Sequence, residues 1–426
     1  MLTVAYLANE FPSAVEPYVT EEIDELQRRG VRIVAGSVLR TKYIPGVGCV
    51  PEVILVPPKL EVALSALWLC LRQWRRLVPL ISRVIFQGRE KIRQRIRALI
   101  HTFLGACYAA TLAGRNVDHI HAHHGYLGSW IAMTAGQLLD VGFSVTLHGS
   151  DLLLQGAYLD VKLKQCSFCL TISEYNKQFI LDRCLGIDPR KVVVSRLGVE
   201  VPEERELPKS RRAGERFTLL SVGRLHAIKN HAFLVRACAR LVSSGMDIEC
   251  LIAGEGPERN RLETLIQELQ LEHRVTLLGH VVREQLGSLY SRANVVVLTS
   301  RSEGIPLVLM EAMARSKIVV APAITGIPEL VIGGKTGLLY EPGSLNDLVD
   351  CLMFVQSAWR RNAGDSDRDT NQRPLKLDWI RHAARVQVQH NFNKKPNLES
   401  FADSFLRRAA AKSKAFSDED LILQQI

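Results

Sequence analysis

The strongest constraint on the fold is an alternation of short apolar runs with longer segments of helical composition, which occurs in two series along the 426 residues. In the first series the apolar runs lie at residues 4–7, 31–36, 118–122, 144–147, 170–172 and 192–195. In the second series they lie at residues 217–222, 248–253, 275–278, 295–298 and 318–320. Alternation of this kind favours parallel sheets covered by helices. We predict an α/β protein with two Rossmann-like, doubly wound domains.

A polar stretch at residues 200–216, rich in Pro and charged residues, separates the two series and has the composition of a linker. We therefore predict an N-terminal domain at residues 1–200, a linker at 201–216 and a C-terminal domain at 217–380. Open α/β sheets bind ligands at the carboxyl ends of their strands. We expect the two domains to face each other across a cleft in which such a ligand binds.

The composition narrows the class of protein. Hydrophobic residues make up 47% and charged residues 23% of the chain, values typical of a soluble globular protein. Nine irregularly spaced cysteines, an odd number, indicate a reducing compartment rather than a disulfide framework. No basic segment precedes the first apolar run, and no apolar run reaches the roughly 18–20 residues that span a bilayer. We expect a cytoplasmic protein.

Positive charge is concentrated in one helical region of the N-terminal domain, residues 72–105. The net charge of the chain is +10 at pH 7. This region holds a single acid, Glu90, against nine basic residues at positions 72, 75, 76, 83, 89, 91, 93, 95 and 97. Apolar residues at positions 92, 96, 99, 100 and 103 follow helical spacing. Three interpretations stay open: a solvated helix face, a surface for anionic lipid headgroups, and a nucleic-acid site. We predict no nucleic-acid partner, because no groove-reading motif or stacking platform accompanies the charge.

Two carboxylates with seven residues between them, Glu303 and Glu311, follow the apolar run at residues 294–298. The order of strand, loop and helix start points backbone N–H groups and the positive end of a helix dipole towards a ligand. A nucleotide sugar suits this arrangement, because it offers phosphates to the N–H groups and hydroxyls to the carboxylates. The alternative is an acid near a helix N-terminus with an unrelated, solvated glutamate.

Further residues of the second half favour a diphosphate ligand. Arg224 and Lys229 follow Gly223, directly after the first apolar run of that half. The glycine permits close approach of the backbone, and the two cations supply fixed positive charge. Either cation alone is more often an ordinary surface residue. Residues 253–257 form another strand-to-helix turn, and residues 278–281 offer backbone groups for a base.

The histidines of the first half allow a metal site by composition alone. His119, His121 and His123 alternate along a predicted strand and share one face, with His124 adjacent. Strand histidines near a ligand site are more often hydrogen-bonded structural groups, and no cysteine or acid is spaced to complete a ligand set. We predict no metal. The single C-x-x-C at residues 166–169 is interpreted as two small core residues.

Taken together, these motifs resemble the retaining GT-B glycosyltransferases of family 4. In the second half the resembling segments are residues 223–225 with Lys229, 254–257, 278–279, 303–311, 326–331 and 337–339. In the first half they are residues 119–123, 148–151 and 172–174. Residues 11–13 with Glu16 point to the exopolysaccharide and colanic-acid-type branch. The resemblance covers residues 1–345 and is strongest after residue 217.

The resemblance implies transfer of a sugar from a UDP- or GDP-sugar to an acceptor hydroxyl, with retention and without a metal. Eight positions are assigned to the donor: Arg224, Lys229, Val281, Glu303, Gly304, Leu307, Val308 and Glu311. The two cations bind the diphosphate, Glu303 binds the sugar hydroxyls, and Glu311 binds the ribose. Backbone N–H groups around Leu307 and Val308 reach the distal phosphate, and Val281 meets the base through its main chain.

In the first half, the resemblance places His148 beside the sugar, so the expected catalytic residues are His148 and Glu303. Many family members carry a Gly-Gly loop after the first strand, whereas this chain has residues 9–13, Asn-Glu-Phe-Pro-Ser. We expect that loop to serve the acceptor, with Glu16, His123 and Asp151 on the acceptor side. The resemblance also implies that residues 381–426 return to the first domain as a helical segment.

The expected partners are the nucleotide sugar, a glycan or lipid-linked acceptor, and an anionic membrane surface. The expected location is the cytoplasm, with peripheral attachment to the inner face of the membrane. Two alternatives remain: a sugar-nucleotide 2-epimerase of the same fold, and a non-catalytic nucleotide-sugar-binding protein. A dehydrogenase is disfavoured, because no G-x-G-x-x-G motif follows the first apolar run.

Overall fold

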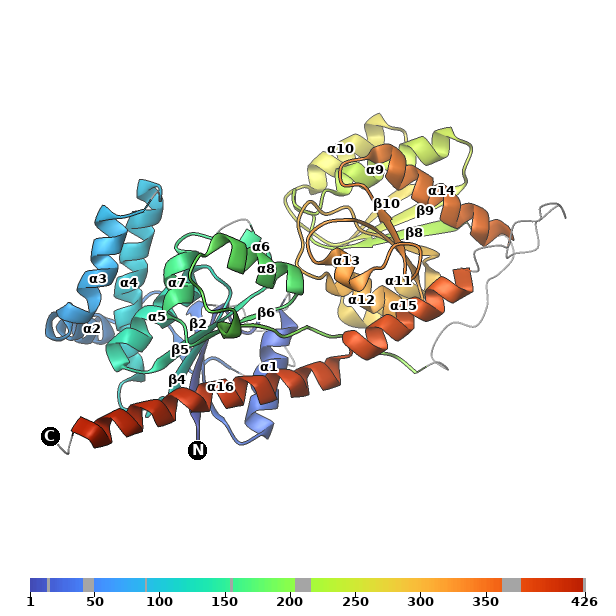
Figure 1. Ribbon diagram of the computed structural model, residues 1–426. Coiled ribbons are helices and arrows are strands. Elements are labelled where there is room, and N and C mark those ends of the chain that lie inside the picture. Colours follow the sequence, from blue (N-terminus) through green and yellow to red (C-terminus); the bar gives the residue numbers. More distant parts are fainter. Residues whose placement is uncertain are drawn as a thin grey trace. The chain divides into compact units, whose positions relative to one another are not determined.

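The computed structural model describes residues 1–13, 16–40, 50–88, 90–153, 156–203, 216–361 and 377–423. The chain divides into two compact units (Figure 1). Unit 1 contains Met1–Arg196 and Leu398–Ile426, and unit 2 contains Leu197–Asn397. Residues 204–215 of the predicted linker lie outside the described residues.

Unit 1 is built on a seven-stranded sheet in the order β3-β2-β1-β4-β5-β6-β7, with every neighbouring pair parallel. The strands are β1 (Thr3–Glu10), β2 (Arg32–Leu39), β3 (Val53–Ile54), β4 (His119–His123), β5 (Gly142–Leu147), β6 (Phe168–Thr171) and β7 (Val192–Val194). The helices are α1 (Pro17–Arg28), α2 (Leu60–Arg72), α3 (Trp74–Phe86), α4 (Ile92–Leu112), α5 (Leu127–Leu139), α6 (Ser150–Leu153), α7 (Leu159–Gln165) and α8 (Glu174–Arg183). The order reverses between β1 and β4, which is the usual place for a ligand at the carboxyl ends of the strands.

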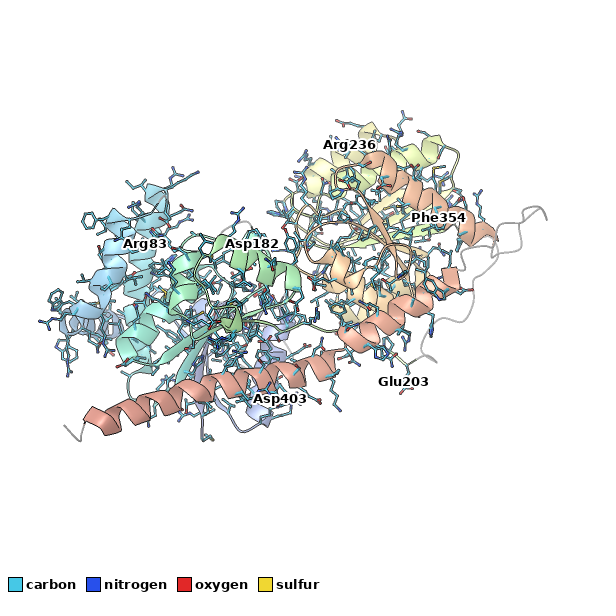
Figure 2. The ribbon with its side chains drawn as sticks, viewed as in Figure 1. Arg83, Asp182, Glu203, Arg236, Phe354 and Asp403 are labelled. Carbon is cyan, nitrogen blue, oxygen red and sulfur yellow. The ribbon has the colours of Figure 1, made fainter. Side chains whose placement is uncertain are left out.

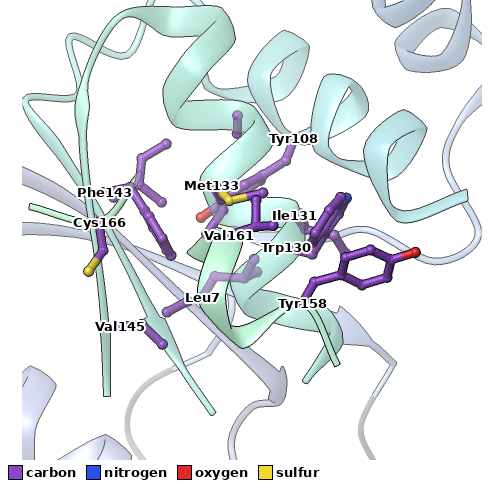
Figure 3. Close-up of a cluster of buried hydrophobic side chains, with 14 of the residues drawn as sticks. Leu7, Tyr108, Trp130, Ile131, Met133, Phe143, Val145, Tyr158, Val161 and Cys166 are labelled. Carbon is purple, nitrogen blue, oxygen red and sulfur yellow. The ribbon is translucent and has the colours of Figure 1, made fainter. Parts of the chain in front are cut away.

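Side chains alternate across this sheet, so unit 1 has a core on each face. On one face, Leu7 and Phe143 from the strands pack against Trp130 and Met133 of α5 (Figure 3). On the other face, α1 and α16 (Lys394–Leu423) cover Val4 and Tyr6. Asp403 of α16, labelled in Figure 2, forms an ion pair with Arg29 at the end of α1. The last helix is therefore part of the hydrophobic core of unit 1.

Unit 2 is built on a six-stranded parallel sheet in the order β10-β9-β8-β11-β12-β13. The strands are β8 (Phe217–Val222), β9 (Ile248–Ala253), β10 (Val275–Gly279), β11 (Val295–Val297), β12 (Ile318–Pro322) and β13 (Leu338–Tyr340). The helices are α9 (His231–Ser243), α10 (Arg259–Glu268), α11 (Arg283–Arg292), α12 (Leu307–Ala314), α13 (Ile327–Leu330), α14 (Leu345–Arg361) and α15 (Leu377–Asn391). Apolar clusters cover both faces of this sheet as well.

The return to unit 1 begins later than the sequence indicated. Residues 381–397 belong to unit 2, because α15 packs on α12, and Ala384 and Val388 of α15 and the following Phe392 are buried in the core of that unit. Only the part of the chain from Leu398 onward joins unit 1. The amphipathic pattern of α15 could not show which of two apolar sheets it covers.

Helices α2, α3 and α4 form a group inserted between β3 and β4, drawn in blue to cyan in Figure 1. Among the described residues, 14 of the 24 exposed large hydrophobic side chains lie on this group, which makes it the main apolar surface of unit 1. They are Leu60, Leu64, Leu67, Trp68, Leu71, Trp74, Val78, Ile85, Phe86, Ile92, Ile96, Leu99, Ile100 and Phe103. The apolar stripe predicted at residues 92–103 is thus a helix face, and it points to solvent.

The basic residues of this group fall into two kinds. Arg95 donates to the main-chain oxygens of Val84, Gly88 and Glu90 at 2.8–3.1 Å, and so holds the connection between α3 and α4 together. Arg83, labelled in Figure 2, pairs with Glu90 at 2.9 Å. Five further basic residues of this group are exposed, and none of them forms an ion pair with an acid among the described residues: Arg72, Arg75, Lys91, Arg93 and Arg97. No helix in the described part of the chain is long and apolar enough to cross a membrane.

Replacing Phe405 of α16 by Ala should lower the free energy of unfolding by about 3–5 kcal/mol, because the ring is fully buried against Phe168 and His119. The control is Trp379→Ala on α15, whose residue is 53% exposed; we expect a loss of about 1 kcal/mol or less. Urea denaturation measures both losses. Equal losses would contradict the buried position of α16.

Candidate active site

All eight positions assigned to the donor lie in unit 2, in loops or helix starts that follow the carboxyl ends of its strands. Arg224 and Lys229 follow β8, and Val281 follows β10. The segment from Glu303 to Glu311, which includes Gly304, Leu307 and Val308, follows β11. Because the strands are parallel, these segments meet at one edge of the sheet. The topology therefore gathers the predicted donor residues in one region.

The backbone at the N-terminus of α12 has the features expected of an anion site. Pro306 precedes the helix and no side chain caps it. Among the described residues, no hydrogen-bond partner is present for the backbone N–H groups of Leu307 and Val308. Free N–H groups at the positive end of a helix dipole bind phosphate. This geometry agrees with the sequence-based assignment of Leu307 and Val308.

Lys229 and Glu303 lie side by side beside this helix. The Lys229 Nζ is 2.6 Å from the Glu303 Oε1, and the two side chains are 23% and 12% exposed. The hydroxyl of Thr299 donates to the main-chain oxygens of Lys229 and Asn230 at 3.1 and 3.2 Å, which ties the loop after β8 to the loop after β11. The pair presents a cation and an anion together, as a ligand with both phosphate and hydroxyl groups requires. Arg224 is exposed nearby in sequence, with no acidic partner among the described residues.

Glycines and a threonine fix the loop that carries Glu303. A Cβ on Gly326 would lie 2.6 Å from the Gly304 oxygen, so only glycine permits this contact between the two loops. The hydroxyl of Thr325 donates to the Glu303 main-chain oxygen at 2.6 Å. Likewise, a Cβ on Gly254 would lie 1.9 Å from the Gly223 oxygen. These motifs therefore hold the donor loops in place.

Glu311 is anchored by a residue that the sequence analysis missed. Its Oε2 accepts a hydrogen bond of 2.8 Å from the hydroxyl of Tyr290 on α11. Tyr290 is 1% exposed, and burial, with Glu311 nearby, raises its pKa well above the ordinary value. Arg315 lies over the Tyr290 ring at 5.2 Å, and all three residues line a small cavity of about 50 Å³. The sequence pattern around Tyr290, that of an ordinary amphipathic helix, does not predict a hydrogen bond to Glu311.

In unit 1, four side chains from different elements form a buried hydrogen-bonded chain. His123 at the end of β4 places its Nε2 2.8 Å from the Glu22 Oε2 of α1. The hydroxyl of Tyr6 on β1 donates to the same Glu22 oxygen and lies 2.7 Å from the His123 Nε2. The His123 Nδ1 lies 3.0 Å from the Nε2 of His148, which follows β5. Sequence reasoning missed Glu22 and Tyr6, because only the fold brings α1 beside β4.

A second cluster adjoins His148. The His124 Nε2 lies 3.0 Å from Glu16 and the Nδ1 lies 3.6 Å from Asp151. Burial alone would lower the pKa of His124, but the hydrogen bonds with Asp151 and Glu16 outweigh burial and raise it to about 10. Burial alone would raise the pKa of Asp151, but its contacts with His124 outweigh burial and hold the pKa of that carboxyl below its usual range. His124 is therefore cationic at neutral pH.

The structure modifies two acceptor-side predictions. Asp151 is fully buried, and its carboxylate accepts from the backbone N–H groups of Gly125 at 2.8 Å and Gly149 at 2.8 Å. His123 is also fully buried within the chain of hydrogen bonds described above. Both side chains organise the loops, and their burial does not support direct contact with an acceptor. Glu16 is partly exposed and keeps its place as an acceptor-side prediction.

Glu22, His121 and His123 also have ligand atoms within 4.8 Å of one another, a spacing that suits a metal ion. Both nitrogens of His121, however, lie at hydrogen-bond distance from hydroxyls, Ser144 at 2.7 Å and Thr146 at 3.0 Å. The other two residues are hydrogen-bonded to each other. The groups are satisfied as a hydrogen-bonded network, and a metal-free protein stays our prediction.

Comparison with known proteins agrees with this geometry. Residues 202–362 match the family described as Glycosyl transferases group 1. The chain is 37% identical over 218 residues to the putative colanic acid biosynthesis glycosyltransferase WcaL of Salmonella typhimurium, a match that covers 50% of each chain. The chain therefore spans half the length of this curated relative.

Two solved structures share the fold. A glycosyltransferase from Rickettsia africae has a TM-score of 0.64 and 20% identity over 96% of this chain and 98% of its own. HepE of Anabaena, in complex with UDP, has a TM-score of 0.66 and 17% identity over 95% of this chain and 100% of its own.

Two parallel-sheet units and these likenesses define the GT-B fold, so the predicted fold class is confirmed. The match to the glycosyl transferases group 1 family covers residues 202–362, which lie within unit 2. The likeness to WcaL over half of the chain agrees with the predicted resemblance to the exopolysaccharide and colanic-acid-type branch.

The raised pKa of His124 makes stability depend on pH. Because the folded-state pKa of about 10 exceeds the ordinary 6.5, the contribution of His124 is complete below about pH 6.5 and is lost as the pH rises through about 10. We expect His124→Gln to lower the free energy of unfolding by about 3 kcal/mol at pH 6.5, and by much less at pH 10. Denaturation at a series of pH values tests this. An exposed control, His273→Gln, should leave the profile unchanged.

Proposed function

We propose that the protein transfers a sugar from a nucleoside diphosphate sugar to an acceptor hydroxyl, with retention of anomeric configuration. The observation that carries the proposal is the Lys229–Glu303 pair at 2.6 Å beside the uncapped N-terminus of α12. The group 1 family and a UDP-bound structure of the same fold support a nucleotide-sugar donor. The match to WcaL supports a glycan or lipid-linked acceptor in exopolysaccharide assembly.

Each donor group has a matching partner in unit 2. The diphosphate lies against Arg224, Lys229 and the N–H groups of Leu307 and Val308. The sugar hydroxyls bind Glu303, the ribose binds Glu311, and the base meets the main chain at Val281. The donor is a UDP- or GDP-sugar, and no metal is required, since fixed cations and the helix N-terminus stabilise the diphosphate.

The chemistry follows from where charge develops. The bond between the anomeric carbon and the diphosphate oxygen breaks, and the acceptor oxygen attacks from the same face. The departing phosphate oxygen takes the acceptor proton. Lys229, Arg224 and the N-terminus of α12 stabilise the negative charge on the leaving diphosphate. His148 orients the sugar and the attacking hydroxyl.

The alternatives predict different products. A 2-epimerase of the same fold would release an epimerised sugar, and a non-catalytic binding protein would release nothing. Incubation with UDP- and GDP-sugars and a lipid-linked acceptor should release the nucleoside diphosphate and a glycosylated acceptor. An epimer without glycosylated product would overturn the proposal.

Glu311→Ala and Lys229→Ala should each weaken donor binding by about 1.5–3 kcal/mol, roughly 10- to 150-fold in Kd, because each removes a charged contact to the donor. Tyr290→Phe should have a smaller effect, since it removes only the hydroxyl that holds Glu311. Arg236→Ala, an exposed residue on α9 labelled in Figure 2, is the control. Calorimetric titration with UDP- and GDP-sugars measures Kd. Unchanged affinity in both site variants would refute the assignment.

We further propose that the α2–α4 group docks the enzyme on the inner face of an anionic membrane, where a lipid-linked acceptor is available. Exposed Trp68 and Trp74 lie on this group beside Arg72 and Arg75, whose guanidinium groups lie 5.2 and 5.8 Å from the ring centres. Apolar side chains favour the interface, and each nearby cation contributes about 1 kcal/mol of attraction to anionic lipid. The charge of this surface matches anionic headgroups.

Arg93→Glu combined with Arg97→Glu should release the protein from phosphatidylglycerol vesicles without changing donor affinity. Arg95 is left intact, because it stabilises the α3–α4 connection. The matched control is Arg236→Glu with Arg261→Glu on unit 2. Co-sedimentation measures binding, which should weaken as the screening length falls from about 10 Å at 0.1 M salt to about 3 Å at 1 M. Equal binding to phosphatidylcholine vesicles, or none to either kind at low salt, would contradict the proposal.

A further inference from the structure

The direction of each hydrogen bond around His148 follows from the chemistry of its partners. The carboxylate of Glu22 accepts, so Tyr6 donates to it, and the Nε2 of His123 must carry a proton to donate to it at 2.8 Å. With a single ring proton, placed on Nε2 by Glu22, His123 has none on Nδ1, and this atom accepts. The Nε2 of His148, 3.0 Å away, must be the donor.

This direction determines which nitrogen of His148 is free. A neutral imidazole carries one proton, so a proton on Nε2 leaves Nδ1 as an acceptor. The Nδ1 of His148 is buried and has no hydrogen-bond partner among the described residues. A buried acceptor without a partner is costly, and a ligand hydroxyl that donates to it would remove the cost.

His148 is also kept neutral by its surroundings. Its ring centre lies 4.7 Å from that of His124, which is cationic, and 4.7 Å from the ring of Tyr18. Burial, followed by the nearby charge of His124, lowers the pKa of His148 well below its ordinary value, against the opposing effect of Asp151. A neutral ring agrees with the hydrogen-bond directions.

We propose that Glu22 and His123 are positioning residues that hold His148 in the Nε2–H tautomer, so that its Nδ1 accepts a hydrogen bond from a hydroxyl of the bound sugar or acceptor. The class of ligand rests on the proposed function, whereas the tautomer rests on unit 1 alone. No proton is transferred: the chain fixes the polarity of His148 and leaves the acceptor proton to the departing diphosphate. His123 contributes to catalysis from within the core, without touching substrate.

The tautomer can be measured without any activity. Protein labelled with ¹⁵N-histidine should show His148 in a single tautomer at pH 7, with Nε2 protonated and Nδ1 not. His123→Phe removes the acceptor of the Nε2 proton and should give a mixture of tautomers. His121→Phe is the matched control: it lies on the same face of β4, is equally buried, and is hydrogen-bonded to Ser144 and Thr146 instead. A proton on Nδ1 of His148 in the unmodified protein, or an unchanged tautomer in His123→Phe, would overturn the proposal.

Glu22 offers a second test through a conservative rescue. The amide oxygen of Glu22→Gln still accepts from His123, whereas Glu22→Ala leaves that proton without a partner. We expect kcat to fall at least 10-fold more in Glu22→Ala than in Glu22→Gln, with the donor Kd within about 3-fold of the unmodified protein in both. Equal losses of kcat in the two variants, with both folded, would overturn the proposal. If the tautomer result holds but no glycosyl transfer is found, the proposed function fails and the inference about His148 stands.

Discussion

The parallel direction of every strand is the constraint on which the rest of the structure depends. In a parallel sheet each strand must be followed by a crossover, and all the carboxyl ends lie along one edge. Residues 74 positions apart, such as Lys229 and Glu303, therefore become neighbours without any direct sequence relation between them. The glycines at positions 254 and 326 matter for the same reason, because crowded loops at one edge leave no room for a Cβ. The chemistry of unit 2 is a consequence of its connectivity.

Unit 1 has the same parallel geometry, but different side chains lie at the carboxyl ends of its strands. Its strand ends carry imidazole rings, and burial together with neighbouring carboxylates sets the charge of each ring. His124 is held as a cation by two carboxylates, while His148, one ring away, is held neutral. Two neighbouring histidines, one cationic and one neutral, show that local contacts, rather than residue type, set the protonation of each ring.

Much of the fold could be predicted from the sequence because strand signals are local. The runs that predicted β1, β8 and β11 are short and predominantly apolar. Glu303 and Glu311 could also be identified from the sequence, because their spacing and their position after a predicted strand are local features. Glu22, Tyr6 and Tyr290 could not be found in this way. Each acts through a partner 16 to 101 residues away, and each lies on an element whose pattern is explained by packing alone. Residues 381–397 were assigned to the wrong unit, because the amphipathic pattern of a helix does not indicate which of two sheets its apolar face covers.

The course of the chain between the two units has a consequence for biosynthesis. Unit 2 is inserted within unit 1: the chain enters at Leu197 and leaves at Asn397, and near these points the Val199 N–H donates to the Phe392 oxygen at 2.9 Å. The face of the first sheet that α16 covers thus stays open while the ribosome synthesises the whole of unit 2. At about 5–20 residues per second, that interval is roughly 10–40 s. Tyr6 and Phe168 lie on that face, so α16 can cover them only after the whole of unit 2 has been synthesised.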